Sequence, residues 1–168
     1  MRVSMLVGAM LLTVNLAQQT SGADKKKDAE IACSAEHLDK SWNLSVKSMA
    51  VKETLLERLG ETKFNPPKAF NEVHVTLEFT KEPGSAKEIR RRFVTEANMP
   101  KVGELALKEP QTQLWLLDGD GVVLKKFEPW SIEGEITGVA GDAFRVVIFC
   151  DPALLKKTKK IDLRPASK

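Results

Sequence analysis

Tyrosine is absent from the chain, and histidine and cysteine occur only twice each among its 168 residues. This scarcity limits the chemistry that the side chains can supply. A zinc site needs three or four converging ligands, and no Cys-x-x-Cys or His-x-x-x-His pair is present. No histidine adjoins a cysteine and no Gly-x-Ser-x-Gly turn occurs, so no activated nucleophile is visible. The sequence predicts no catalytic residue, metal site or cofactor, and we expect a protein that is not an enzyme.

A strong excess of either charge is also missing, because 26 basic residues stand against 23 acidic ones. Such a balance gives little support to binding of a charged polymer. Basic residues cluster at Arg90, Arg91 and Arg92 and again at Lys156, Lys157, Lys159 and Lys160. We interpret both clusters as solvated surface and expect no specific nucleic acid partner, because no aromatic residues are interleaved. A weaker hypothesis, polyanion binding, requires both clusters to share one face.

Long apolar runs are confined to the N-terminal region. Residues 3–17 carry no charge, follow Arg2 and precede the small residues Ser21, Gly22 and Ala23. This pattern is typical of a secretory signal peptide, predicted here as residues 1–23. The run is shorter than the roughly 20 residues of a membrane-spanning helix. We therefore expect an exported protein, periplasmic or secreted, without a transmembrane segment after cleavage.

The mature chain is expected to form one domain. Residues 24–40 read as a linker with a short helical segment, residues 41–164 as the domain and residues 165–168 as a tail. In an exported protein, Cys33 and Cys150 could form a disulfide that closes a long loop. Two separate thiols are the alternative, since geometry decides whether they can meet.

Alternating apolar residues predict the clearest strands. In residues 72–80 one face carries Val73, Val75, Leu77 and Phe79, and the other carries polar residues that include His74. Such alternation predicts one face on a core and one in water, which places His74 in solvent. Residues 144–150 also predict a strand, with Phe144, Val146, Ile148 and Cys150 facing the core.

A hairpin is predicted at residues 113–127. Asp118-Gly119-Asp120-Gly121 lies between two apolar runs, which is a strong hairpin signal. The two aspartates resemble half of a calcium loop, but Val122 and the residues after it offer no further oxygen ligands. Both faces of residues 114–117 are apolar, so we expect this strand to be central and largely covered.

The remaining segments give weaker predictions. Residues 49–60 favour a short helix or loop, although an irregular strand is an alternative, and Asn65-Pro66-Pro67 should break regular structure. Residues 87–95 read as a strand whose edge is guarded by arginines. Further expected elements are strands at 42–46, 104–107 and, as a last edge strand, 161–164, with a loop or helical turn at 153–160.

Together these patterns predict an all-β fold, an immunoglobulin-like antiparallel β-sandwich of seven or eight strands with a short helical insertion near residues 50–60. The hairpin resembles bacterial exported immunoglobulin-like domains with a Phe-x-Leu-Tyr-Asp strand. The matching residues are 114–118 followed by Gly119, with Leu114 in place of Phe and Leu117 in place of Tyr. The Asn-Pro-Pro-x-x-Phe segment at 65–70, the strand at 73–77 and the strand before Pro152 follow a similar order.

The resemblance implies a noncatalytic envelope module and carries over no functional residue. We expect a monomer that binds a protein or a cell-envelope polymer or serves as structural support, with pairing at an exposed strand edge as one route. The alternative is a small exported carrier or enzyme with a cavity between its sheets, which would need a large apolar pocket with a few converging polar groups.

Overall fold

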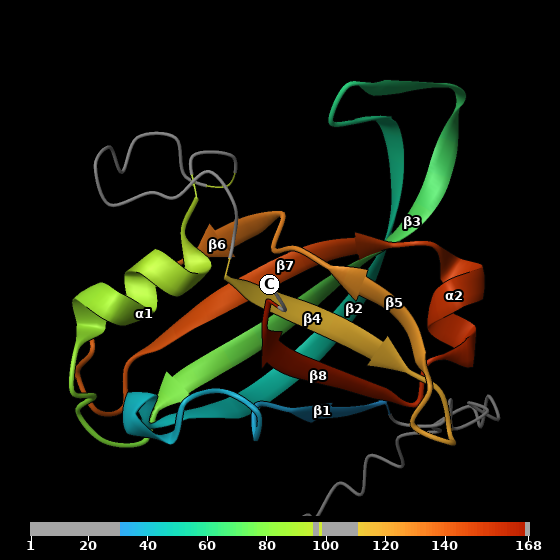
Figure 1. Ribbon diagram of the computed structural model, residues 1–168. Coiled ribbons are helices and arrows are strands. Elements are labelled where there is room, and N and C mark those ends of the chain that lie inside the picture. The colour runs from blue at the N-terminus through green and yellow to red at the C-terminus, as the bar shows by residue number, and fades with distance from the viewer. Residues whose placement is uncertain (1–30, 96–97, 99–110, 167–168) are drawn as a thin grey trace, which may run out of the picture.

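The computed structural model describes residues 31–95, 98 and 111–166 (Figure 1). The described residues are mostly β, with 54% of them in strands, which confirms the predicted all-β class. The helical elements among these residues are short: a 3₁₀ turn η1 (Lys40–Trp42) and the helices α1 (Ala86–Phe93) and α2 (Pro152–Lys157). The predicted signal peptide and the predicted strand at 104–107 lie outside the described residues.

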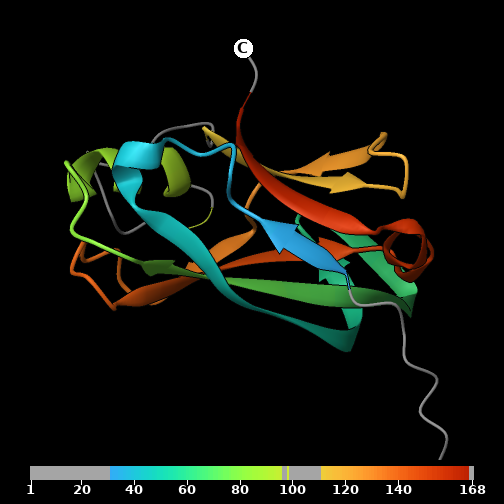
Figure 2. The same cartoon turned by 90° about the horizontal axis from the view of Figure 1, so that it is seen from below.

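The strands form two four-stranded sheets (Figures 1 and 2). The long sheet has the order β2 (Leu44–Leu59), β3 (Thr62–Phe79), β7 (Ala143–Cys150) and β6 (Ser131–Glu133). The short sheet has the order β1 (Ala32–Ser34), β8 (Lys160–Pro165), β4 (Thr112–Leu117) and β5 (Val123–Phe127). Neighbouring strands are antiparallel except β1 and β8, which run parallel.

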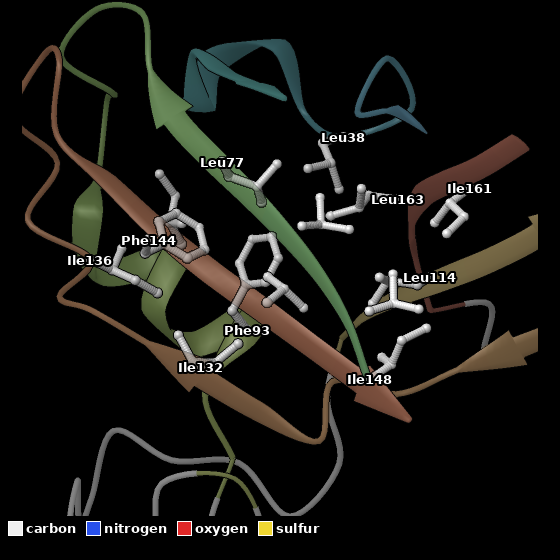
Figure 3. Packing of buried hydrophobic residues seen from close by; sticks show 14 of the residues in the cluster. Leu38, Leu77, Phe93, Leu114, Ile132, Ile136, Phe144, Ile148, Ile161 and Leu163 are labelled. Atoms are coloured by element: carbon white, nitrogen blue, oxygen red, sulfur yellow. The ribbon is translucent and has the colours of Figure 1, made fainter. Parts of the chain in front are cut away.

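The hydrophobic core lies between the inner faces of the two sheets (Figure 3). Phe93 of α1 reaches into it and packs edge-on against Phe144, with ring centroids 5.2 Å apart. The alternation predicted for two strands of the long sheet is confirmed by core residues that are at most 1% exposed: Val73, Val75, Leu77, Phe79, Phe144, Val146, Ile148 and Cys150. Leu114 and Leu116 of the predicted hairpin are fully buried as well.

The predicted hairpin is present as β4 and β5, and β4 lies inside the short sheet between β8 and β5. Asp118 uses its carboxylate within the turn, where Oδ1 accepts hydrogen bonds from the backbone N–H groups of Asp120 and Val122. Trp115 on the outer face is partly covered by cations, with Lys126 Nζ 4.0 Å and Arg164 Cζ 4.5 Å from its ring centre. The Asp-Gly signal therefore marks a turn stabilised by its own side chain.

Residues 49–59 are strand and Gly60 lies in a turn, so the preferred helical interpretation was wrong and the alternative strand is correct. Val51, Leu55 and Leu59 are spaced by four, and this spacing places residues on one side of a helix and of a strand alike. Asn65-Pro66-Pro67 lies within β3, with a cis peptide bond before Pro66, and the expected break appears there as a register shift that leaves residues 64–67 without partners on β2. Prolines are tolerated here because, among the described residues, this part of β3 pairs neither with β2 nor with β7, which joins only from Asn71 onward.

Beyond that point the β2–β3 hairpin continues as a two-stranded arm, residues 54–70, which rises from the body in Figure 1. Gly60 has a positive φ of 60° and makes the turn at the tip. Gly60 lies close to the ring of Trp130, because a Cβ at this position would be 4.0 Å from it. The tip therefore bends back over the outer face of the long sheet. The arm therefore has two anchors, its continuous strands and this contact.

Residues 87–95 fold as the helix α1 through Phe93 and not as the predicted strand. The Ser85 hydroxyl accepts a hydrogen bond from the backbone N–H of Glu88 and caps the helix. Ile89 and Phe93 are four residues apart and both fully buried, as one face of a helix requires. The side chain of Arg90 donates to the carbonyl of Ile136, and Arg92 pairs with Glu88. The arginines belong to a helix and do not guard a strand edge.

Two further expectations were wrong. His74 is buried, with 4% exposure, although the alternation placed it in solvent. β8 was expected at an edge, yet it lies between β1 and β4. Both errors have one cause: alternation reports which face a residue is on, but it does not report what covers that face or which strands lie beside it.

Candidate functional site: a groove between two strand edges

Each sheet ends on the same side of the molecule at a strand with a free edge. Among the described residues, β1 pairs only with β8, and β2 pairs only with β3. Figure 2 shows these two edge strands side by side along the seam between the sheets. Unpaired backbone N–H and C=O groups of an edge strand are ready to pair with another extended chain. The part of β2 before the arm, from Leu44 to Glu53, runs along this seam.

The seam is hollowed into three pockets of about 650, 380 and 590 Å³. The first and second share Cys33 and Val46, and the second and third share Ile31. The pockets therefore follow one another as a single groove, which we call the seam groove. Its apolar lining comes from both sheets, the loop after β1 and the helix α2: Ile31, Cys33, Leu38, Leu44, Val46, Met49, Val51 and Leu155.

The rim of the seam groove is charged differently at its two ends. Glu36, Asp39 and Lys40 lie at the η1 end, and Glu53, Lys156 and Lys159 lie at the α2 end, so each end carries a small net charge of opposite sign. The Ser41 hydroxyl and the Ser41 backbone N–H both donate to Asp39, which lowers the pKa of that carboxyl and keeps it ionised. The groove thus combines an apolar floor with a negative and a positive end, and it is open to solvent along its length.

The two cysteines are free thiols, so the disulfide that the sequence allowed is not formed. Cys33 lies on edge strand β1 of the short sheet. Cys150 ends β7, and β3 stands between β7 and β2 in the long sheet. Burial raises the pKa of each thiol to about 11. Both therefore stay protonated at neutral pH, and Cys33 supplies the groove with an apolar surface and not with a nucleophile.

The two basic clusters do not combine into one surface. Arg90, Arg91 and Arg92 belong to α1, and the four lysines belong to α2 and the start of β8. These helices stand at opposite ends of the molecule in both views (Figures 1 and 2). Polyanion binding required a shared face, so this placement removes its main support.

A buried carboxylate that the sequence analysis did not single out lies on the outer face of the short sheet. Asp162 of β8 is fully buried, and its Oδ2 accepts a hydrogen bond of 2.8 Å from Arg164 Nε. Nδ1 of His37 lies 2.8 Å from the same oxygen. The pair fastens the loop after β1 onto β8, because a buried carboxylate needs compensating charge.

This pair also resembles the orienting half of a catalytic triad, in which a carboxylate holds a histidine. The His37 side chain is 48% exposed, and no hydrogen bond from a serine, threonine or cysteine to His37 is present among the described residues. Ser34 pairs in register with Asp162, but its Oγ accepts from the backbone N–H of Glu36. The geometry supports a structural clamp.

Comparison of the chain with known protein families, with curated proteins and with solved structures finds no match. Among the described residues, no helix is both long enough and apolar enough to cross a membrane.

Proposed function

We propose that this protein is a noncatalytic, exported module with an immunoglobulin-like β-sandwich fold, which binds an extended segment of a protein partner in the seam groove. The fold assignment is supported by two facing sheets around one core and by the resemblance of the β4–β5 hairpin to exported immunoglobulin-like domains. The signal-peptide pattern of residues 1–23 supports export.

The observation that carries this proposal is the free edge of β2 beside the apolar floor of the groove. An added strand gains main-chain hydrogen bonds from such an edge, and its alternate side chains enter pockets on one side. Val46 and Met49 of β2 and Cys33 of β1 form the middle of that floor. The partner segment should therefore be extended, with apolar residues at alternate positions.

The charged rim adds a direction to this binding. Lys156 and Lys159 should attract acidic residues at one end of the partner segment, and Glu36 and Asp39 should attract basic residues at the other. Complementary rim charges mainly set orientation and association rate, and they weaken with salt.

A displayed library of random peptides, selected on the purified protein, tests the proposal. We expect enriched sequences with alternating apolar residues, and backbone amide NMR shifts that change along β2 when a selected peptide is added. Met49→Lys places a charge in the groove and should weaken that peptide at least about tenfold, the effect of about 1.4 kcal/mol. Leu55→Lys is the matched control, because Leu55 lies on the arm and is 71% exposed.

Two results would contradict this function. One is a selection that enriches no peptide that binds, and the other is equal affinity of Met49→Lys and Leu55→Lys for the selected peptide. The alternative of a small-molecule carrier or enzyme receives less support, because the pockets along the seam are open to solvent and carry no activated nucleophile among the described residues.

A further inference from the structure

A second polar cluster lies on the outer face of the long sheet, away from the seam groove. Its centre is His74, whose side chain is only 5% exposed. Neither ring nitrogen makes a hydrogen bond of acceptable geometry among the described residues. A buried imidazole that lacks well-directed hydrogen bonds is costly, so the two nitrogens, one of them 2.8 Å from a Glu72 oxygen, call for an explanation.

Two carboxylates stand beside this ring. Glu72 shares the outer face of β3 with His74 because two residues separate them along the strand, and its Oε1 lies 2.8 Å from His74 Nε2. Glu133 comes from β6, and its Oε2 lies 3.9 Å from His74 Nδ1. One ligand atom from each of the three residues lies within 4.8 Å of the others. Residues from two different strands are thus brought together around one imidazole.

We propose that Glu72, His74 and Glu133 form a site for a divalent transition-metal ion, with zinc as the best-fitting member of that class. Imidazole nitrogen and carboxylate oxygen both bind zinc at about 2.0–2.2 Å. Two ligands at that distance in a tetrahedral site stand about 3.4 Å apart, so the Glu72 and His74 atoms, now 2.8 Å apart, must separate by about half an ångström to admit the ion. Glu133 completes a three-ligand set by a side-chain rotation, and water fills the remaining position.

The imidazole selects the class of metal. Imidazole suits zinc, copper, iron and nickel, whereas magnesium and calcium prefer sites made of oxygen alone. Access is open on the carboxylate side, because the Glu72 and Glu133 side chains are 26% and 46% exposed. A metal here would tie the three-residue strand β6 directly to β3, which are separated by β7 in the sheet.

Arg145 competes with the ion for one ligand. Its Nη1 lies 2.8 Å from Oε2 of Glu133, the same oxygen that faces His74. Binding must therefore draw Glu133 away from Arg145, and the positive charge nearby opposes a cation. Removing Arg145 should therefore strengthen metal binding at this site. A cluster that serves only as a structural ion pair would not predict this result.

Titration of the full chain with zinc and with cobalt, followed by calorimetry and by the visible absorption of bound cobalt, tests the site. We expect one saturable equivalent and no comparable binding of magnesium or calcium. His74→Gln should abolish binding, and Glu133→Gln should weaken it at least about tenfold, as even outer partners of metal ligands do. His37→Gln is the matched control, because it removes the other histidine of the chain and should leave the titration unchanged.

Arg145→Met should change the zinc affinity in the opposite direction and bind zinc more tightly than the unchanged protein does. Thermal unfolding followed by circular dichroism shows whether each variant folds. If His74→Gln does not fold, Glu133→Gln and Arg145→Met carry the test, since both side chains are more than 40% exposed. The proposal is overturned if the unchanged protein shows no saturable zinc binding, or if the folded His74 or Glu133 variant binds zinc as the unchanged protein does.

Discussion

The hairpin formed by β2 and β3 has two halves that differ although the same strands run through both. In the core half, β3 residues 71–78 pair with β2 on one side and with β7 on the other. In the arm, residues 54–70, the two strands pair only with each other among the described residues. Leu77 is fully buried in the first half, whereas Leu55 in the second is 71% exposed.

This contrast shows that the burial of a strand's side chains depends more on the strands and sheets packed beside it than on its strand propensity. A third strand and a facing sheet bury the side chains of the core half, and an isolated two-stranded hairpin is marginally stable in water. The arm adds local contacts of its own, with Phe64 and Phe70 ring centroids 5.5 Å apart and the tip against Trp130. Its order therefore depends on continuity with the core half.

The largest expected difference between the halves is in the free energy of unfolding. Leu77→Ala should lower it by about 2–5 kcal/mol, because it leaves a cavity between the sheets. Leu55→Ala should change it by less than about 0.5 kcal/mol, as is usual for exposed positions. Urea unfolding of both variants measures the two values, and equal losses would show that the arm packs on the body far more than the contacts above indicate.

A smaller difference is expected from pH at the junction of the halves. Cys150 pairs in register with Asn71, where the arm leaves the sheet, and burial raises its pKa from 9.0 to about 11. Above pH 9 the unfolded thiol loses its proton while the folded one keeps it, so stability should fall by up to about 1.4 kcal/mol per pH unit. Urea midpoints at pH 8 and pH 10 measure the effect.

Cys150→Ala is the control for this pH dependence and should reduce the loss of stability between pH 8 and pH 10. Cys33, whose pKa is also raised to about 11, should account for a second part. A thiol reagent should react slowly with both residues in the folded protein and quickly in urea. Fast reaction of Cys150 without denaturant would mean that the junction opens readily.

A smaller effect than that of pH is expected from removing most of the arm. Replacement of residues 56–68 by Asn-Gly joins Leu55 to Ala69, which pair in register, through a turn that hairpins favour. The body should keep its fold and unfold within a few tenths to about 1 kcal/mol of the full chain, because the core residues are untouched. Thermal unfolding measures this, and loss of cooperative unfolding would show that the arm is part of the folding unit.

The sequence predicted the strands whose apolar residues alternate strictly and whose apolar face lies on the core. Leu77 and Phe144 lie on strict alternations and face the core as expected, and the turn at Asp118 was placed correctly. The helix expected at residues 49–60 was wrong because a spacing of four places residues on one side of a helix and of a strand alike. α1 carried a readable signal, the Ser85-x-x-Glu88 capping pattern ahead of Ile89, which was overlooked.

The candidate sites were less accessible to sequence reasoning. The seam groove depends on β1 and β2 becoming edges on the same side, which topology decides and composition does not. Glu133 meets His74 only because β6 pairs with β7 beside β3. The spacing of Glu72 and His74 was visible along the chain, but its third member was more than 50 residues away on a strand that was not predicted.

The parallel pairing of β1 with β8 bears on how the protein folds as it is synthesised. These strands meet in space although more than 120 residues separate them in the chain. Contacts of such long range form slowly, because a long loop must close first. β2 and β3 can pair as soon as they emerge from the ribosome, but β1 must wait for β8. The seam groove, which needs β1 as one wall, is therefore among the last features to appear.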